Sequence, residues 1–234
     1  MQLLNRLAPA SKSLRVLAHL LTYPGDEVRA DLADMRVVLT EEKALTPARI
    51  AELDGLMKSL GGRPSLEVEA EYVEVFDRGR ATSLHLFEHV HGDSRERGPA
   101  MIDLAQTYEK AGLYLALGEM PDYLPVVLEF ASTQPPREAR AFLAEIAHIL
   151  NAMFAALQQR GSAYASVIGA LLELAGESAQ PVKVAAEEPI DESWREPPAF
   201  DGCSSKGQAG PGQPQPIHFV RHPSGKGSST GAIA

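Results

Sequence analysis

The strongest constraint on the fold is a run of apolar residues at helical spacing across residues 137–159. They recur at i, i+3, i+4 and i+7, the pattern of a helix that buries one face. No convincing run of alternating β-branched residues, which would indicate a half-buried strand, occurs in the chain. The sequence therefore predicts an all-α fold. The apolar positions of this run are Phe142, Leu143, Ile146, Ile149, Leu150, Met153, Phe154 and Leu157.

Shorter helical patterns fill most of the chain on either side of that run. They are separated by turn signals such as the YPGD stretch at 23–26, the glycine pair at 61–62 and the single glycines Gly92, Gly112 and Gly161. We expect a compact single-domain bundle of roughly eight to ten helices. The shorter predicted helices span about residues 14–21, 28–39, 47–60, 64–76, 81–90, 101–111, 122–132 and 167–174.

The composition changes near Gly176 and predicts two parts. The chain has 234 residues, of which 44% are apolar, enough for one sizeable core. Beyond residue 176 glycine, proline and serine dominate, and such a segment buries too little apolar surface to offset its ordering entropy. We expect a helical domain at 1–176 and a flexible tail at 177–234. The patch DESWREPPAF at 191–200 holds the only tryptophan, and it either docks on the body or a partner or belongs to a mobile tail.

Cysteine content and charge restrict the compartment and the partners. The single cysteine, Cys203, excludes an intrachain disulfide and favours a reducing compartment. No apolar run is long enough for a membrane helix, and no secretory signal is recognisable, so we expect a cytoplasmic protein without membrane insertion. The net charge of −9 argues against nucleic acid as the main partner. It fits a basic peptide partner and an ordinary soluble protein equally well.

The stretch HLFEH at 85–89 matches H-x-x-E-H, a reversed zinc-protease motif. On a helix His85 and His89 would lie on one face, and Glu88 could act as the general base. A zinc site also needs a third protein ligand, and none stands out. We therefore predict no metal and no catalytic residue, with a zinc hydrolase as the enzyme alternative. Third-ligand candidates by position alone are Glu138, Glu145 and His148.

Two polar loops flank this predicted helix. The stretches DRGRATS at 77–83 and DSRERG at 93–98 are rich in arginine and aspartate. They can form caps and surface ion pairs of small individual value, or the polar rim of a groove. No nucleophile–base arrangement is visible, since Ser83 lacks a glycine elbow and Cys203 lies in the predicted tail.

The segment YVEVFDRGRATSLHLFEHVHGDSRERGPAMIDL at 72–104 closely resembles the signature of the NarJ family, the assembly chaperones of respiratory nitrate reductase, also called its delta subunit. This family is part of the wider TorD/DmsD/NarJ group of redox-enzyme maturation proteins. Three further stretches agree: LLTYPGDEV at 20–28, LPVVLEF at 124–130 and the apolar run at 137–159. The resemblance covers about residues 10–176.

The resemblance implies an all-helical, cytoplasmic, non-catalytic chaperone without a cofactor of its own. Its partner would be the catalytic (alpha) subunit of nitrate reductase, through its N-terminal segment, before molybdenum cofactor insertion and membrane docking. A zinc hydrolase and a generic helical scaffold remain the alternatives. Carried over to this sequence, the partner-binding region comprises His85, Glu88, His89, His91, Asp93 and Arg95.

The helical spacing of this region separates core anchors from partner-binding positions. We expect Leu84, Phe87 and Val90 or His91 to anchor the predicted helix in the core. The partner-binding residues would then face the groove that receives the client.

Overall fold

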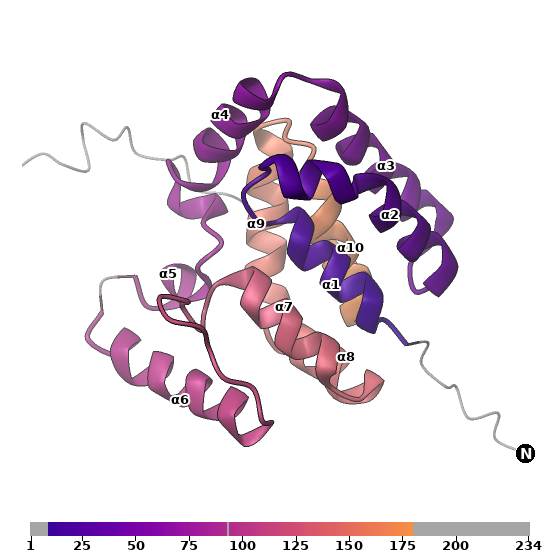
Figure 1. Ribbon diagram of the computed structural model, residues 1–234. Helices are drawn as coiled ribbons and strands as arrows, with labels where there is room; N and C mark the ends of the chain where they lie inside the picture. Colours follow the sequence, from indigo (N-terminus) through magenta and orange to yellow (C-terminus); the bar gives the residue numbers. More distant parts are fainter. Residues whose placement is uncertain (1–8, 93, 180–234) are drawn as a thin grey trace, which may run out of the picture. The chain divides into compact units, whose positions relative to one another are not determined.

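The computed structural model describes residues 9–92 and 94–179, all of which belong to one compact unit. These residues form ten α-helices and one short 3-10 turn, with no strand among them, so the all-α prediction is confirmed (Figure 1). The predicted tail from residue 180 onward, its 191–200 patch and Asp93 lie outside the described residues, and the domain division at 176 stays a prediction. The elements are α1 (Ser11–Leu20), α2 (Asp26–Glu42), α3 (Pro47–Gly62), α4 (Ser65–Phe76), η1 (Arg80–Thr82), α5 (Leu86–Val90), α6 (Arg97–Lys110), α7 (Leu124–Thr133), α8 (Pro136–Glu145), α9 (Ala147–Gln159) and α10 (Ala165–Ala175).

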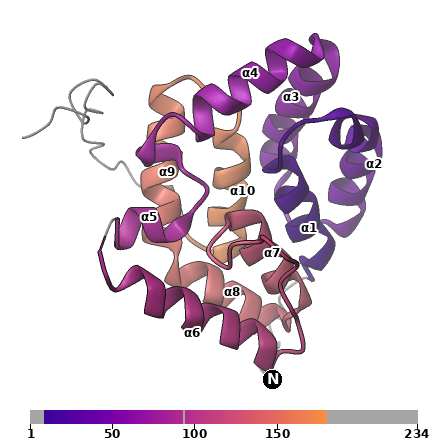
Figure 2. The ribbon, with the colours of Figure 1, turned by 60° about the vertical axis from the view of Figure 1, so that its left-hand side comes forward.

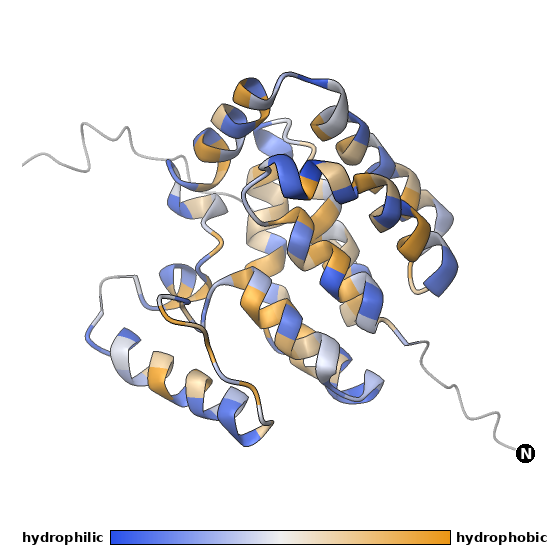
Figure 3. Cartoon of the chain, in the orientation of Figure 1, coloured by the Kyte–Doolittle hydropathy of each residue, from blue (hydrophilic) through white to orange (hydrophobic). Residues whose placement is uncertain are grey.

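The last helix of the described residues, α10, lies at the centre of the bundle. It packs against α3, α8 and α9 and also contacts α1; Figure 2 shows it between α9 and the α1–α3 side. An apolar surface on all sides of a helix is the mark of a buried one. In contrast, hydrophobic and hydrophilic residues alternate along α2, α3 and α4, as expected for helices with one face in solvent (Figure 3). The buried residues of α10 are Ser166, Val167, Ile168, Gly169, Ala170, Leu171, Leu172 and Ala175.

A glycine in α10 allows an arginine to lie across that helix. The guanidinium of Arg49, from α3, occupies the space that a Cβ at Gly169 would need. Arg49 forms ion pairs with Glu52 and with Glu173 of α10. The carboxylate of Glu173 also accepts the backbone N–H of Thr46 at 2.5 Å, just before α3. These contacts fasten α3 to the central helix at its polar edge.

The predicted helix 137–159 is two helices, not one. α8 and α9 meet at Ile146 and are bent by 64°. The bend allows both helices to pack against α10. No glycine or proline marks the break, so the apolar spacing continues through it. Among the described residues no single helix is long and apolar enough to cross a membrane, and only the bent α8–α9 pair reaches that length and apolarity together.

The predicted helix 81–90 is also wrong in its first half. η1 ends at Thr82, the chain is extended at His85, and α5 begins only at Leu86. Backbone groups that a helix would use are paired elsewhere: the carbonyl of Leu84 accepts the N–H of Leu124 at 2.8 Å. The hydroxyl of Thr82 donates to the carbonyl of Val75. Such competing bonds favour an extended segment over a helix.

Candidate functional site

A short antiparallel pairing connects the signature segment to the start of α7. We call this pairing, residues 84–86 with 122–124, the neck. Its two outer hydrogen bonds run from the N–H of Leu124 to the carbonyl of Leu84 at 2.8 Å and from the N–H of Leu86 to the carbonyl of Asp122 at 3.0 Å. Residues 86–121 connect the two sides of the neck and are here called the arm. Leu86 belongs to both the neck and the arm. Figure 1 and Figure 2 show its helix α6 at the edge of the bundle, joined through α5 and the loop that leads into α7.

The carboxylate of Asp122 lies fully buried in the neck, with 0% of its side chain exposed. It accepts the N–H of Phe87 at 3.2 Å and lies 3.3 Å from Nδ1 of His85. Nη2 of Arg97 lies 3.8 Å from this carboxylate and 3.6 Å from that of Glu88. A buried carboxylate is tolerated only when it is paired and hydrogen-bonded. Asp122 therefore ties together the extended segment before α5, the first turn of α5 and the first residue of α6.

This environment favours the charged form of His85. The hydrogen bond to Asp122 is the main cause that raises the pKa of His85, and the charges of Asp122 and Glu88 raise it further. Partial burial and the charge of Arg97 act in the opposite direction. The imidazole is thus part of the Asp122 network, and the ring also lies against that of Tyr123, with centroids 5.4 Å apart.

The first prediction concerns the pH dependence of stability. Because the folded-state pKa of His85 is raised, its stabilising contribution is fully present below the unfolded-state value of about 6.5 and is lost as the pH rises through the folded-state value. We expect His85→Gln to lower the melting temperature more at about pH 5.5 than at about pH 8.5. Partial exposure of the His85 side chain keeps the effect small. Equal losses at both pH values would contradict the assignment.

Among the described residues, the predicted partner-binding residues His89, His91 and Arg95 do not join this network. Nε2 of His89 lies 2.8 Å from the carbonyl of Ser83, and the ring of His91 meets that of Phe87 edge-on. Arg95 is exposed, and Asp93 lies outside the described residues. The structure therefore brings together His85 and Glu88, through Asp122 and Arg97, but not His89, His91 or Arg95.

The geometry that the zinc alternative requires is not present. His85 precedes α5, so His85 and His89 do not share a helical face, and each imidazole contacts another group. The described part of the chain holds no group of three or more His, Cys, Asp or Glu side chains placed to bind a metal ion. The described residues therefore do not favour the zinc alternative.

The structure confirms some of the predicted core anchors at residues 84–90 and replaces one of them. Leu84 is buried, as expected, and Phe87 packs against the core while partly exposed. Val90 is 52% exposed, and Leu86, at 3%, takes its place in the core. The cause is the late start of α5, which rotates its apolar face relative to that of a helix beginning at residue 81.

Sequence reasoning missed Asp122 and Arg97. Asp122 lies in the PDY stretch before α7, 37 positions from His85, and nothing local distinguishes a buried aspartate from an exposed turn residue. Arg97 lies within the DSRERG loop, which the sequence identified only as polar. The resemblance at LPVVLEF, residues 124–130, was the one signal that pointed to this part of the chain.

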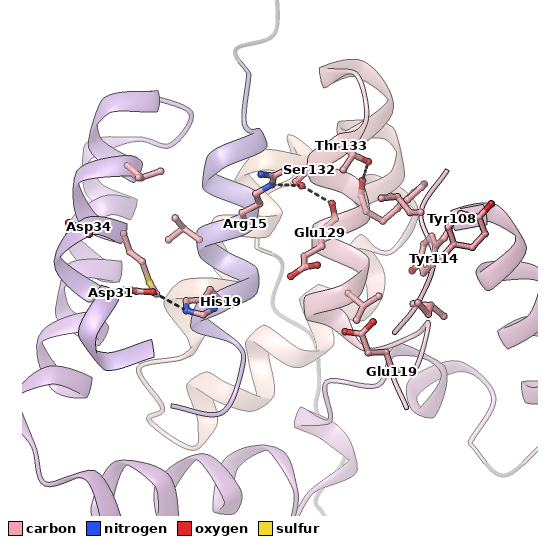
Figure 4. A pocket seen from close by; sticks show the side chains of 17 residues that line it. Arg15, His19, Asp31, Asp34, Tyr108, Tyr114, Glu119, Glu129, Ser132 and Thr133 are labelled. Atoms are coloured by element: carbon pink, nitrogen blue, oxygen red, sulfur yellow. Dashed lines mark hydrogen bonds and ion pairs between the residues drawn. The ribbon is translucent and has the colours of Figure 1, made fainter. Parts of the chain in front are cut away.

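A cavity of about 740 Å³ opens between α1, α2, α7 and the loop that follows α6 (Figure 4). Its volume falls within the usual range of ligand pockets. The arm contributes one wall, through Tyr108 and the residues at 113–115. The apolar lining consists of Val16, Met35, Val38, Tyr108, Leu113, Tyr114, Leu115, Val126 and Phe130.

Acidic side chains predominate among the charged residues of this cavity. Asp31 and Asp34 come from α2, whereas Glu119 and Glu129 come from the opposite side (Figure 4). Of the basic residues, His19 lies 3.7 Å from Asp31, and Arg15, also of α1, donates to the hydroxyl of Ser132. A low-dielectric cleft lined mainly by one sign of charge concentrates ligands of the opposite sign. The cavity therefore suits a ligand with an apolar face and positive charge.

The described residues define an all-α protein with an apolar cavity whose charged lining is mainly acidic. The chain belongs to the nitrate reductase delta subunit family, whose family model matches residues 39–168. The resemblance read from residues 72–104 is thereby confirmed.

Individual relatives agree with this assignment. The chain is 42% identical over 185 residues to the nitrate reductase molybdenum cofactor assembly chaperone NarJ of Escherichia coli (strain K12), covering 79% of this chain and 78% of that protein. It is 37% identical over 161 residues to the nitrate reductase-like protein NarX of Mycobacterium tuberculosis (strain ATCC 25618 / H37Rv), covering 65% of this chain and 22% of that protein. A redox enzyme maturation protein from Archaeoglobus fulgidus shares the fold, with a TM-score of 0.50 and 19% identity over 71% of this chain and 94% of that one.

Proposed function

We propose that this chain is a system-specific chaperone for the immature catalytic (alpha) subunit of a respiratory nitrate reductase. It keeps that subunit competent for molybdenum cofactor insertion and delays its docking at the membrane. The observation that carries this proposal is 42% identity, over 79% of the chain, to a chaperone named for that task. The chain acts in the cytoplasm, catalyses no reaction and holds no cofactor of its own.

The N-terminal segment of the catalytic subunit occupies the cavity in this proposal. An amphipathic helix can lay its apolar face in such a groove. The apolar floor, which includes Val38, Leu115 and Val126, would supply most of the affinity. The acidic residues Asp31 and Glu129 would orient basic side chains of the client.

The signature segment provides a second contact with the client. Arg95 is exposed, and Glu88, His89 and His91 are each partly accessible, so their outer faces can meet the folded part of the catalytic subunit. Asp93, which lies outside the described residues, is included in this proposed contact only because of its place in the sequence. His85 contributes mainly through Asp122, against which its ring lies.

The second prediction tests the cavity as the client site. Val38→Asp places a charge in the apolar lining and should weaken binding of a peptide from the N-terminal segment of the catalytic subunit by about tenfold or more, equivalent to about 1.4 kcal/mol. Isothermal titration calorimetry gives the affinity, and a melting curve on the same sample confirms folding. Val37→Asp is the matched control. Val37 is next to Val38 on α2, but its side chain is 53% exposed and lies outside the cavity lining.

Three outcomes separate the competing readings. A folded Val38→Asp variant that binds as tightly as the parent would move the client site away from the cavity. Equal binding of a scrambled peptide would favour a generic helical scaffold. If the parent neither binds the catalytic subunit nor raises the yield of cofactor-loaded enzyme in cells, the proposed chaperone function is wrong.

A further inference from the structure

The arm leaves the body and returns to it at one place. Leu86, its first residue, and Asp122, which directly follows it, are joined by a backbone hydrogen bond of 3.0 Å. Tyr123 stands opposite His85 in the same pairing. Because its two ends are joined at one place, the arm can change its angle to the body without disturbing the helices on either side of the neck.

Few contacts outside the neck hold the arm in place. Helix α6 buries a single residue, Tyr108. Its hydroxyl donates to the carbonyl of Pro121 at 2.8 Å, and its ring lies 4.7 Å from that of Phe130 in α7. Ile102 and Leu117 of the arm are exposed to solvent. An element with so few buried apolar contacts has low local stability, so the polar contacts in the neck have a large share in its orientation.

The same arm forms one wall of the cavity. Tyr108, Leu115 and Glu119 lie across the cavity from Val16 of α1 and Met35 of α2. A rotation of the arm about the neck therefore widens or narrows the space between these side chains. The width of the cavity depends on the angle at which the neck holds the arm.

We propose that Asp122 is a positioning residue for client binding: its carboxylate holds α6 through Arg97, and this contact sets the width of the cavity without touching the client. The inference rests on the proposed function, in that the client segment sits in the cavity. Asp122 is buried and does not line the cavity. Arg97 is the first residue of α6, so its ion pair with Asp122 acts on the helix at the point nearest the neck.

The Asp122–Arg97 ion pair can hold the start of α6 at the neck because one of its two groups is buried there. The two groups lie 3.8 Å apart, and one of them is fully buried, so solvent and salt screen the pair less than an exposed one. Glu88, 3.6 Å from the same guanidinium, keeps Arg97 directed toward the neck. Removal of the positive charge of Arg97 therefore releases α6 from Asp122 while the backbone pairing of the neck remains.

The test measures two quantities separately: the distance across the cavity and the affinity for the client peptide. Probes at Ala33→Cys on α2 and Gln106→Cys on α6, both exposed positions, report the distance across the cavity by pulsed electron spin resonance in a Cys203→Ser chain. Arg97→Gln should broaden this distance distribution in the absence of client. It should also weaken binding of the client's N-terminal peptide by about fivefold or more, the low end of coupling between separate sites, through faster dissociation.

Matched variants distinguish positioning from a general loss of structure. Arg97→Lys keeps the charge and should restore most of the affinity and the narrow distribution. Lys110→Gln removes one positive charge from the other end of α6 and should change neither. Asp122→Asn should reproduce Arg97→Gln, and the double variant should be no worse than either alone. If Asp122→Asn does not fold, the partly exposed Arg97 position still decides the question.

The outcomes separate this inference from the proposed function. Unchanged distances and affinity in a folded Arg97→Gln variant would overturn the inference. A changed distance with unchanged affinity, in a parent that binds the peptide, would overturn the coupling between arm and cavity. If the parent binds no client peptide, the proposed function fails, and the distance measurement alone decides whether Asp122 positions the arm.

Discussion

Leu171→Ala will lower the free energy of unfolding by about 3–5 kcal/mol. Leu171 is fully buried in α10, the helix against which α3, α8 and α9 pack. Removing its terminal carbons leaves a cavity that these neighbours cannot easily fill, because each of them also contacts other elements of the bundle. Chemical denaturation with an unchanged slope in denaturant gives the stability difference.

The same substitution at an exposed leucine provides the control for this prediction. Leu66, in α4, is 78% exposed, and Leu66→Ala should change the stability by no more than about 0.5 kcal/mol. Similar losses at both positions would show that the burial pattern of the bundle is wrong. A small loss at Leu171 alone would mean that α10 is not the centre of the core.

Leu86→Ala will cost about 2–4 kcal/mol, whereas Val90→Ala will cost less than about 0.5 kcal/mol. Both residues belong to α5, but Leu86 is 3% exposed at the neck and Val90 is 52% exposed. A continuous helix from residue 81 would instead place Val90 on the anchoring face. The melting temperatures of the two variants therefore decide between these two backbones in a single experiment.

The variants Leu86→Ala and Val90→Ala should also differ in the yield of mature enzyme in cells. Leu86→Ala should reduce the yield of mature enzyme in cells because less of the chaperone is folded, and a lower growth temperature should restore part of that yield. Val90→Ala should leave stability unchanged. If Val90→Ala destabilises the chain as strongly as Leu86→Ala, the α5 boundary described here is wrong.

The helices could be predicted from sequence wherever their apolar spacing is local. The YPGD turn and the glycines at 61–62 do separate helices, as predicted. The predicted helices 81–90 and 137–159 were wrong, and the two errors have a common physical cause. The extended segment at 83–85 results from pairing with residues 122–124, and the bend at Ile146 results from packing of α8 and α9 on α10. Neither partner is visible in a local pattern.

The candidate site was predictable only in part. The resemblance at 72–104 located the segment that contains His85 and Glu88, and the structure brings both to the Asp122 network. Asp122 itself could not be found, since its burial depends on contacts from α5 and α6 far away in the sequence. The cavity also depends on tertiary structure, because its lining comes from α1, α2, α7 and the arm.

The position of α10 has a consequence for synthesis of the protein on the ribosome. The helix on which α3, α8 and α9 pack is the last helix described, so the earlier helices emerge before the surface that covers them exists. Until Ala175 has been added, α1 and α9 carry apolar faces with no complete partner. Partly synthesised chains of this kind are prone to aggregation. The unfinished chain therefore exposes apolar surface at a stage that ends only when α10, the last helix described, is made.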